Sequence, residues 1–438
     1  HIGVLVLAYV LFKLVRQKFD WRKSLIEIAK FSLAGALGAG LAAVQLLPFF
    51  EYLSRSQQLL ERTGANTHYL PKSLAILNFI PDFFGNQAIN AQAYFTTQTN
   101  YNESTMGYIG LSFLFLSLVA VLYFYREPLV KFYTVAAALC FAVVYKAPLV
   151  YDLVVLLPGF EQGANHRLAL FYGFSLIVLG CLALQGMVSS PLSRKRLLSA
   201  GLVFLGIFCL SLWPHRNIVL AIIQGGWQNS YPYLWQGRTL LLFALNFSVI
   251  LAILASRYKY RHVAIVTLVI IETMAHGMIY NTVTRNKDFY PNHPTVSFLT
   301  EQYTNNKARV LFVGNIFPPN LGTWYGINQI SEYDALGLVS YENYKKTIGD
   351  YEGMTEIFKA PLDPTALALG GVKYVVLEND QASLVQSQLK AKTSFQEGNF
   401  TVLETETLPR AFVVEANSID QLKEEINKQA RQPAKAIS

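Results

Sequence analysis

Two ionisable side chains, Glu272 and His276, lie four residues apart inside one long apolar segment of the sequence. In an α-helix this spacing places both side chains on the same face. A charged group at membrane depth is costly and normally faces other protein rather than lipid. The pair therefore predicts an interior polar contact. It is either a hydrogen-bonded pair that fixes helix packing or a proton relay or sugar contact.

Cationic residues stand beside the ends of other apolar segments. Arg167 follows His166 and opens the segment that continues from Leu168, and Arg238 lies near the start of a later one. A guanidinium at the headgroup level can hold an anionic group through charge-assisted hydrogen bonds. Arginines at helix ends also extend to lipid headgroups without a further role, so both interpretations stay open.

Acidic residues also lie between the apolar segments, where a carboxylate could accept a hydroxyl proton in a transfer reaction. Glu103 directly precedes an apolar segment, and Asp82 follows Pro81 in an apolar setting. The other acids considered are Glu51, Asp152 and Glu161. Each of them is equally compatible with a solvated loop residue or a helix cap.

The elements that must position these residues are apolar helices, since a hydrocarbon core about 30 Å thick needs about 20 apolar residues. Eight candidates are 1–16, 25–50, 106–125, 129–146, 167–188, 196–213, 234–255 and 262–280. The chain begins inside the first of them, so we expect an N-terminally truncated fragment. We predict a mainly α polytopic membrane protein with about eight transmembrane helices, its helical domain covering residues 1–280.

Basic residues divide unequally between the connections of these helices. Most Lys and Arg occur in 13–23, 126–131, 189–196 and 256–262, and few occur in the opposite connections, 51–105, 147–166 and 214–233. The positive-inside rule places the first group in the cytoplasm. The outer loop 51–105, whose apolar stretch Ser73–Phe84 could lie along the interface, and the C-terminal domain then lie outside the cytoplasmic membrane.

Residues 281–438 alternate short apolar stretches with charged ones and predict a soluble, extracytoplasmic α/β domain. Its strand candidates are Arg309–Val313, Lys373–Leu377, Phe400–Leu403 and Ala411–Glu415. Its helix candidates are Thr295–Tyr303, with Pro294 in the first turn, and Ile419–Lys428, with Ser418 and Gln421 as a capping box. No nucleotide-binding or hydrolase motif gives this domain chemistry of its own.

Composition excludes some partners and sites. The net charge of +8 does not indicate nucleic-acid binding, because the basic excess lies in the membrane part and no basic stripe with interleaved aromatic residues occurs. The three cysteines have neither disulfide nor zinc-site spacing. Most aromatic residues fit an interfacial belt, and Tyr231, Tyr233 and Trp235 form the cluster that we would test for sugar contact.

Several short motifs follow one another in a recognisable order. In the first part of the chain they are Val44–Pro48, Glu51–Ser56, Asn78–Asn86, Glu103–Gly110, Leu157–Phe160 and Asn165–Arg167. In the second part they are Asp288–Pro291, Pro319–Leu321, Gly371–Val376 and Leu408–Val414. Together they resemble the bacterial YfhO family of membrane proteins over most of the chain.

The resemblance implies a GT-C-like glycosyltransferase that moves a sugar from a polyprenyl-phosphate carrier to a cell-envelope acceptor such as lipoteichoic acid. Arg167, Arg238 and His166 would bind the donor phosphate, and Glu103 or Asp82 would be catalytic. The first outer loop of such enzymes, with its catalytic carboxylate, would precede residue 1. These two acids could then be sugar or metal contacts instead.

The expected partners are the lipid bilayer, the lipid-linked sugar donor and an envelope polymer or lipid acceptor. We assign no metal ligands, and a divalent metal stays open as a cofactor. Two other functions remain: a transporter or flippase of a lipid-linked sugar, and a noncatalytic envelope scaffold. A continuous polar path along the helices would favour transport, whereas an outer pocket joining loop 51–105 to Arg167 would favour the enzyme.

Overall fold

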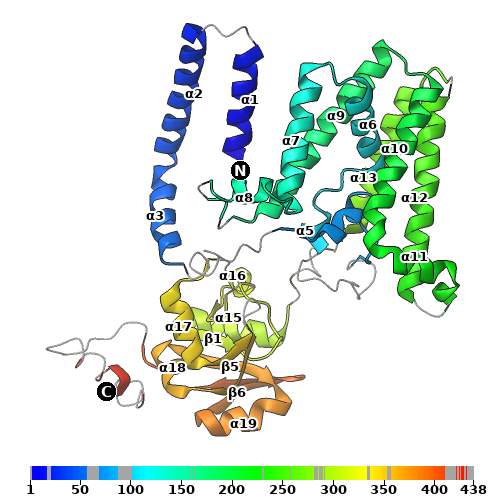
Figure 1. Cartoon of the computed structure of the whole chain (residues 1–438). Helices are drawn as coiled ribbons and strands as arrows, with labels where there is room; N and C mark the ends of the chain where they lie inside the picture. The colour runs from blue at the N-terminus through cyan, green and yellow to red at the C-terminus, as the bar shows by residue number, and fades with distance from the viewer. Residues whose placement is uncertain are drawn as a thin grey trace. The chain divides into compact units, whose positions relative to one another are not determined.

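The structure is a computed structural model. It describes residues 2–16, 21–56, 69–86, 101–157, 159–161, 163–228, 231–256, 258–280, 285, 290, 292–332, 336–352, 357–409, 421, 424, 426–428 and 431. Contacts divide the chain into two units. Figure 1 shows the chain coloured by residue number. Unit 1 comprises His1–Gly35 and Thr63–Val283, and unit 2 comprises Ala36–Arg62 and Thr284–Ser438.

The described regular elements of unit 1 are helices joined by turns. Its α-helices are α1 (Ile2–Arg16), the first part of α2 (Trp21–Leu41), α5 (Tyr101–Thr105), α6 (Leu111–Tyr123), α7 (Pro128–Val144), α8 (Val150–Val154), α9 (Ala169–Ser189), α10 (Arg194–Leu212), α11 (Arg216–Ile223), α12 (Tyr231–Ala255) and α13 (Arg261–Tyr280). Short 3₁₀ turns are η1 (Lys72–Asn78), η2 (Asn165–Leu168), η3 (Trp213–His215) and η4 (Gly226–Gln228). The mainly α prediction for this part is confirmed.

Phenylalanines on two neighbouring helices form the aromatic core of unit 1. Phe204 and Phe208 are four residues apart on α10, and Phe243 and Phe247 are four apart on α12, so each pair lies on one helix face. The rings stack in matching pairs, with centroids 5.0 Å apart for Phe204 and Phe247 and 3.9 Å apart for Phe208 and Phe243. All four are buried. This packing fixes α10 against α12.

The prediction of eight membrane-spanning helices is wrong. Among the described residues, three helices are long and apolar enough to cross a membrane: Asn165–Ser189, Arg194–Ile223 and Tyr231–Ala255. A fourth results if Leu25–Leu41 and Ala43–Ser54, bent by 74°, count as one span.

For two of the predicted spans the cause of this error is helix length. Every predicted segment contains a helix, but α6 has 13 residues and α7 has 17. These correspond to about 20 Å and 26 Å, short of a hydrocarbon core of about 30 Å. The apolar run that includes α6 continues into residues that are not helical, and Gly110 before it has a positive φ of 87°.

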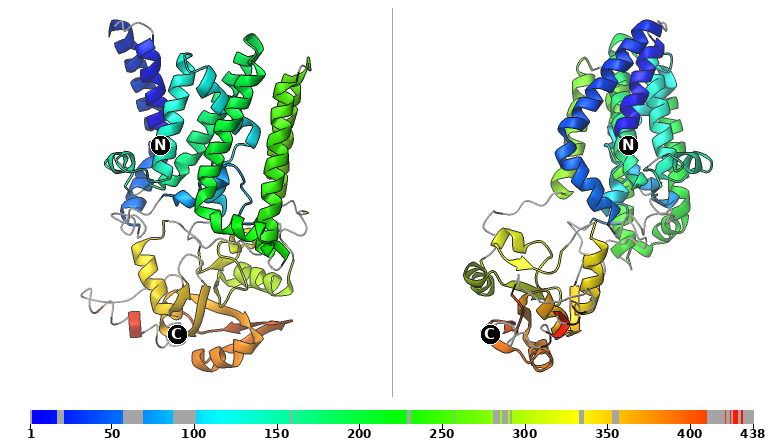
Figure 2. Two further views of the ribbon diagram at one scale, coloured as in Figure 1. Left: turned by 45° about the vertical axis from the view of Figure 1, so that its right-hand side comes forward. Right: turned by 90° about the vertical axis from the view of Figure 1, so that its left-hand side faces the viewer.

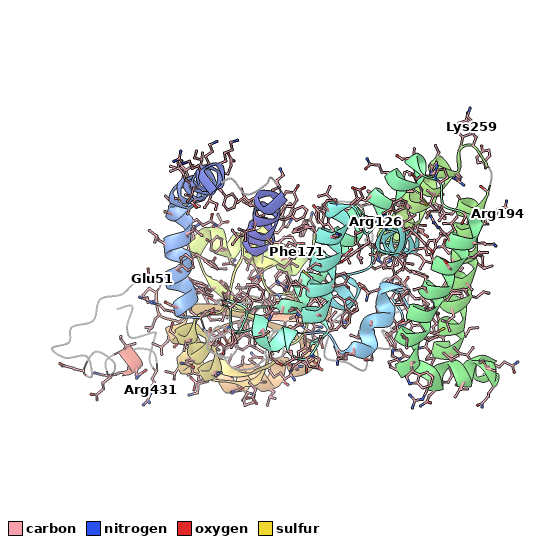
Figure 3. The ribbon with its side chains drawn as sticks, turned by 45° about the horizontal axis from the view of Figure 1, so that its top comes forward. Glu51, Arg126, Phe171, Arg194, Lys259 and Arg431 are labelled. Carbon is pink, nitrogen blue, oxygen red and sulfur yellow. The ribbon has the colours of Figure 1, made fainter. Side chains whose placement is uncertain are left out.

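Basic residues gather at one end of the helices of unit 1. The Tyr123 hydroxyl donates to the Arg196 carbonyl oxygen at 2.8 Å, and Arg194 Nε donates to the Ala255 carbonyl oxygen at 3.0 Å. The end of α6, the start of α10 and the end of α12 therefore meet. Figure 3 labels Arg126, Arg194 and Lys259 at this end.

Unit 2 contains the predicted α/β fold, which is confirmed as a small sheet with helices. Its five strands are ordered β2-β1-β5-β7-β6, where β1 (Arg309–Phe312) pairs in parallel with β2 (Asn328–Gln329) and β5 (Val372–Glu378). Strand β7 (Phe400–Glu404) runs antiparallel to β5 and to β6 (Lys392–Glu397). A separate hairpin joins β3 (Gly349–Glu352) to β4 (Ile357–Leu362).

Helices cover both faces of the five-stranded sheet (Figure 2). On one face, alternate strand residues such as Leu311 and Val375 pack against α17 (Val339–Ile348), α18 (Pro364–Leu369) and α19 (Asn379–Leu389). On the other face, Val310 and Tyr374 pack near Leu299 of α15 (Pro294–Asn306). The period of two along each strand produces two separate cores.

Three of the four predicted strands match β1, β5 and β7, while Ala411–Glu415 lies outside the described residues. The helix predicted from Thr295 is α15, with Pro294 in its first turn. Ser418 and half of the helix predicted after it also lie outside the described residues, and the described half is helical.

Helix α3 (Ala43–Ser54) belongs to unit 2, although it is distant in the sequence from the other helices and the strands of that unit. Directly after α3, the Arg55 carbonyl oxygen accepts a hydrogen bond from the Val339 backbone N–H at 3.1 Å, and Ser56 forms an antiparallel bridge with Leu338. The apolar segment 25–50 therefore continues directly into a contact with the start of α17.

Candidate functional site

The segment 69–86 is packed into the helices of unit 1. Its apolar side chains Leu74, Ile76 and Leu77 are buried. His215 Nε2 lies 2.7 Å from the Ser73 carbonyl oxygen, and Trp235 Nε1 donates to the Asp82 carbonyl oxygen at 2.7 Å. Because contacts near both ends hold this segment against other helices, it is a fixed part of unit 1.

Buried polar contacts join the segment 69–86 to the end of α7 and to α9. Asn78 Nδ2 donates to the Tyr145 hydroxyl at 2.7 Å, and the Tyr172 hydroxyl donates to Asn78 Oδ1. A Cβ added at Gly107 would overlap the Tyr172 hydroxyl, so this position accommodates glycine alone. The close approach places α5, two residues before Gly107, beside α9.

Glu103 of α5 contacts His166 and Arg167 of η2, directly before α9. Its Oε1 lies 3.2 Å from His166 Nε2 and 3.6 Å from an Arg167 guanidinium nitrogen. The side chain of His166 is 9% exposed, that of Glu103 is 25% exposed and that of Arg167 is 62% exposed. We call these three residues the Glu103 group. It contains three of the residues singled out in the sequence.

The Glu103 group has the components of an anion site with an adjacent carboxylate. Arg167 presents five N–H donors, and its exposed guanidinium can contact a ligand beside its Glu103 contact. Asn165 Nδ2 donates to the Phe160 carbonyl oxygen at 2.7 Å, which fixes the turn that carries His166 and Arg167. A phosphate at Arg167 would thus lie close to a carboxylate that can accept a proton.

Glu272 and His276 belong to a second polar group. Glu272 Oε2 accepts from the Ser112 backbone N–H at 3.1 Å, and Glu272 Oε1 accepts from Asn246 Nδ2 at 2.5 Å. The His276 ring lies 5.0 Å from the Tyr108 ring. Both residues of the predicted pair therefore face protein, where Glu272 ties together the elements α6, α12 and α13.

Asp82 lies near this second group. Its Oδ1 accepts from Asn86 Nδ2 at 3.1 Å. Burial raises the pKa of the Tyr108 hydroxyl above its usual value, and the negative charges of Glu272 and Asp82 raise it further. The two acids proposed as catalytic, Asp82 and Glu103, are thus built into different surroundings.

Arg238 is exposed on α12, and the contacts of the described residues do not connect it to the Glu103 group. Trp235, one of the aromatic residues considered for sugar contact, uses its indole N–H for the Asp82 carbonyl. Within the described residues, no set of three or more His, Cys, Asp and Glu side chains is arranged to hold a metal ion.

Three participants in these groups were not singled out in the sequence: Asn78, Tyr108 and Asn246. An asparagine inside an apolar helix is a usable signal, because a buried amide needs a partner. Asn246 could therefore have been paired with Glu272, its nearest polar counterpart in the neighbouring apolar segment. Asn78 and Tyr108 lie in the motifs Asn78–Asn86 and Glu103–Gly110, but nothing in these motifs indicated a buried polar contact.

The comparisons with curated proteins and with solved structures give no match. A comparison with protein families matches residues 2–432 to the family described as "Bacterial membrane protein YfhO". The match covers both units, including the Glu103 group and the sheet. The chain is therefore a member of the bacterial YfhO family of membrane proteins.

Proposed function

We propose that this protein is a membrane glycosyltransferase that moves a sugar from a polyprenyl-phosphate carrier to a cell-envelope acceptor such as lipoteichoic acid. The observation that carries the proposal is the Glu103 group. It combines a carboxylate, an imidazole and a largely exposed guanidinium at the start of the long apolar helix α9. A lipid-linked phosphate needs this combination of an apolar neighbour and a cation.

The roles divide according to exposure. Arg167, 62% exposed, binds the donor phosphate, and His166, 9% exposed, holds the Glu103 carboxylate in place. Binding of phosphate draws the guanidinium toward the ligand and frees one carboxylate oxygen. Glu103 then accepts the acceptor hydroxyl proton as the acceptor oxygen bonds to C1 of the sugar, while the bond between C1 and the phosphate oxygen breaks and leaves polyprenyl phosphate at Arg167. Asp82 and Arg238 are assigned no chemical role in this proposal.

The charge distribution supports action on the outer side of the cytoplasmic membrane. The span Asn165–Ser189 is 25 residues long, about 37 Å, with the Glu103 group at its start and the basic residues beginning at Arg194 just after its end. The positive-inside rule assigns the basic end to the cytoplasm. The Glu103 group then faces outward, where envelope polymers are assembled.

The alternative of a transporter of a lipid-linked sugar receives less support. Glu103 belongs to the connection 51–105, so its ion pairs join that connection directly to Arg167. Glu272, the acid inside an apolar helix, is held by a backbone N–H and an amide in the described residues. Such a fixed acid suits helix packing better than the alternating exposure that transport requires.

The test uses the full-length protein in liposomes with a radiolabelled polyprenyl-phosphate hexose and purified lipoteichoic acid. Wild type is expected to transfer label to the polymer. Glu103→Gln should lower the transfer rate at least about 100-fold while donor binding persists, because general-base catalysis typically contributes that much. Glu161→Gln, which changes an exposed acid in another connection, is the matched control and should transfer normally.

Equal transfer by wild type and Glu103→Gln would remove Glu103 from the mechanism. Movement of label across the bilayer without any transfer to acceptor would support the transporter instead.

A further inference from the structure

A pocket of about 420 Å³ opens on the surface of unit 2 beside α15. Its volume falls in the range of small-molecule sites. It is lined by Asn292, His293, Val296, Ser297, Thr300, Glu301, Thr304 and Tyr325. Most of these side chains carry a hydroxyl, amide, imidazole or carboxylate group. The lining therefore suits a ligand with many hydroxyl groups.

The pocket is formed where α15 meets α16 (Gly322–Tyr325). The Thr300 hydroxyl oxygen lies 2.9 Å from the Val296 carbonyl oxygen and 3.0 Å from the Tyr325 carbonyl oxygen. These contacts fix the two helices against one another. Both helices belong to unit 2 (Figure 1), so the pocket needs no contribution from unit 1.

An aromatic platform adjoins the pocket. The rings of Tyr290 and Trp324 stack with centroids 4.0 Å apart at an interplanar angle of 14°, and the Tyr290 ring also meets the edge of Tyr325 at 6.3 Å. Trp324 is nevertheless 64% exposed. Since Tyr290 covers one face of the indole, the exposed surface of Trp324 is on the other face.

A flat exposed ring beside a polar pocket matches the two sides of a pyranose sugar. The C–H groups on one face of the sugar pack on an aromatic ring, while the hydroxyl groups at its edge bond to amide, hydroxyl and carboxylate side chains. Asn292, Ser297 and Glu301 are exposed, and no hydrogen bond holds these three side chains among the described residues. Their polar groups are available to a ligand.

We propose that unit 2 binds a saccharide chain through Trp324 and the pocket beside α15. The described residues that line the pocket include the carboxylate of Glu301 and no Lys or Arg that could hold a phosphate, so the ligand is a neutral or amino-sugar saccharide rather than a polyphosphate chain. That this saccharide is part of the acceptor rests on the proposed transferase function. Binding itself does not depend on it.

Binding is measured by calorimetry on the full-length protein in detergent, without donor. The probes are short oligosaccharides of glucose, of galactose and of N-acetylglucosamine, and an oligomer of glycerol phosphate. At least one oligosaccharide should bind, and Trp324→Ala should weaken its binding about tenfold or more, whereas Trp324→Phe should stay within about threefold. Ser297→Trp, which fills the pocket, should abolish binding.

Trp213→Ala is the matched control, since Trp213 is an exposed tryptophan of unit 1. It should bind like wild type. Glu103→Gln should also bind like wild type, so a protein that binds saccharide but transfers no sugar would retain this inference and lose the proposed function. The inference is overturned if no oligosaccharide binds, if binding survives both Trp324→Ala and Ser297→Trp, or if glycerol phosphate competes for the same site.

Discussion

Glu103 Oε1 lies 3.2 Å from His166 Nε2, although the helices α6 and α7 separate the two residues in the sequence. The contact exists because α7 and α9 pack against one another and return the chain to the end of unit 1 from which α6 starts. The buried Asn78 contacts with Tyr145 and Tyr172 hold the same region together. The geometry of the Glu103 group therefore depends on the packing of α7 against α9 and on the buried contacts of Asn78.

Arg167→Ala is expected to weaken donor binding roughly 10- to 100-fold, because a charge-assisted hydrogen bond to phosphate contributes about 1.5–3 kcal/mol. Arg167→Lys should retain part of the affinity, since it keeps the charge but loses the planar fork. Binding is measured with a fluorescent polyprenyl phosphate in detergent. Arg216→Ala, an exposed arginine of α11 that lies near the Trp213 ring, is the control. Wild-type affinity in both Arg167 variants would move the donor site elsewhere.

The positive-inside rule predicts that the basic end of unit 1 is cytoplasmic and that the opposite end is outside. In intact cells, an impermeant thiol reagent should label cysteine placed at Asn217, and it should not label cysteine placed at Ser190. Both positions are exposed. A third cysteine, at the exposed Ser394, reports on unit 2 and should be labelled.

The labelling background lacks the three native cysteines, Cys140, Cys181 and Cys209. Permeabilised cells should show labelling at every introduced position. Labelling of Ser190→Cys in intact cells would invert the orientation and, with it, the outward placement of the Glu103 group.

Glu272→Gln is expected to keep most of the stability of unit 1, because an amide oxygen can still accept one of the two hydrogen bonds. Glu272→Leu should lose about 1–3 kcal/mol, since it leaves the Asn246 amide and the Ser112 N–H without their acceptor. Thermal unfolding in detergent measures the difference. If Glu272→Gln instead abolished activity with unchanged unfolding, Glu272 would be a proton carrier and not a packing residue.

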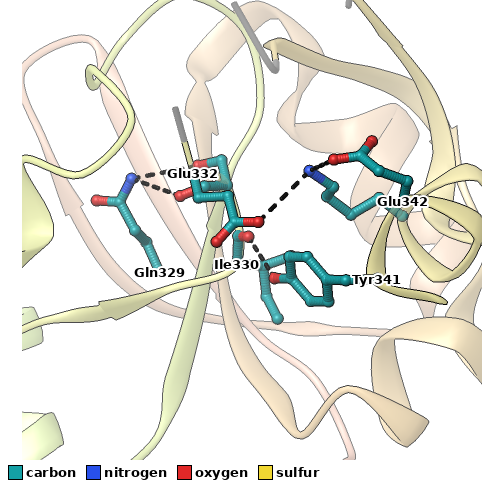
Figure 4. A network of polar contacts seen from close by, with 7 residues as sticks. Gln329, Ile330, Glu332, Tyr341 and Glu342 are labelled. Carbon is teal, nitrogen blue, oxygen red and sulfur yellow. Dashed lines mark hydrogen bonds and ion pairs between the residues drawn. The ribbon is translucent and has the colours of Figure 1, made fainter. Parts of the chain in front are cut away.

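The buried ammonium of Lys345 is expected to stabilise unit 2 through its glutamate partners, Glu332 and Glu342, both labelled in Figure 4. Its side chain is 0% exposed, and Nζ lies 2.7 Å from Glu342 Oε1 and 3.9 Å from Glu332 Oε1. Lys345→Met should lower the free energy of unfolding by about 3 kcal/mol, because it leaves a partly buried carboxylate without its cation. Adding Glu342→Gln should restore part of that loss in thermal unfolding. Independent, additive effects would contradict the pairing.

Tyr344 is expected to make the stability of unit 2 fall at high pH. Burial raises the pKa of its hydroxyl to about 12, although nearby Arg309 lowers it somewhat. The unfolded chain has a tyrosine pKa of about 10. Folding therefore favours the protonated hydroxyl, and this contribution is complete below pH 10 and is lost as the pH rises through about 12.

The measurement compares urea unfolding of wild type and Tyr344→Phe between pH 8 and pH 12. At pH 8 the free energy of unfolding of the variant should be about 1 kcal/mol lower than that of wild type, because the variant lacks the hydrogen bond to the Ala366 carbonyl oxygen. The difference between the two proteins should shrink as the pH rises. A constant difference would show that Tyr344 does not titrate with unfolding.

Residue patterns predicted only part of the local elements, and strands β2, β3, β4 and β6 were not predicted. Each apolar segment of unit 1 contains a helix, and three strands of unit 2 were predicted from their short apolar runs. The number of membrane-length helices was not predictable from apolar runs, since the run 106–125 includes Gly110, whose positive φ precedes the start of α6. A helix can begin only at a residue whose backbone conformation permits it, whereas an apolar run in the sequence can start several residues earlier.

The sequence also placed Glu103, His166 and Arg167 beside helix ends, but it left Asp82 and Arg238 as equal candidates. Their separation into different surroundings follows from which helices pack together, and that depends on side chains distant in the sequence. Local patterns carry no information about such partners.

By itself, the sequence determined the periodicity of the elements, the basic ends of the helices and the change of residue pattern near residue 280, because these depend on neighbouring residues. Tertiary structure alone decided that the chain after α3 pairs with Val339, that Glu103 meets Arg167, and that Tyr290 stacks on Trp324. Burial of apolar surface in other parts of the chain brings together the segments that make these contacts. The residues in contact therefore do not by themselves determine that they meet.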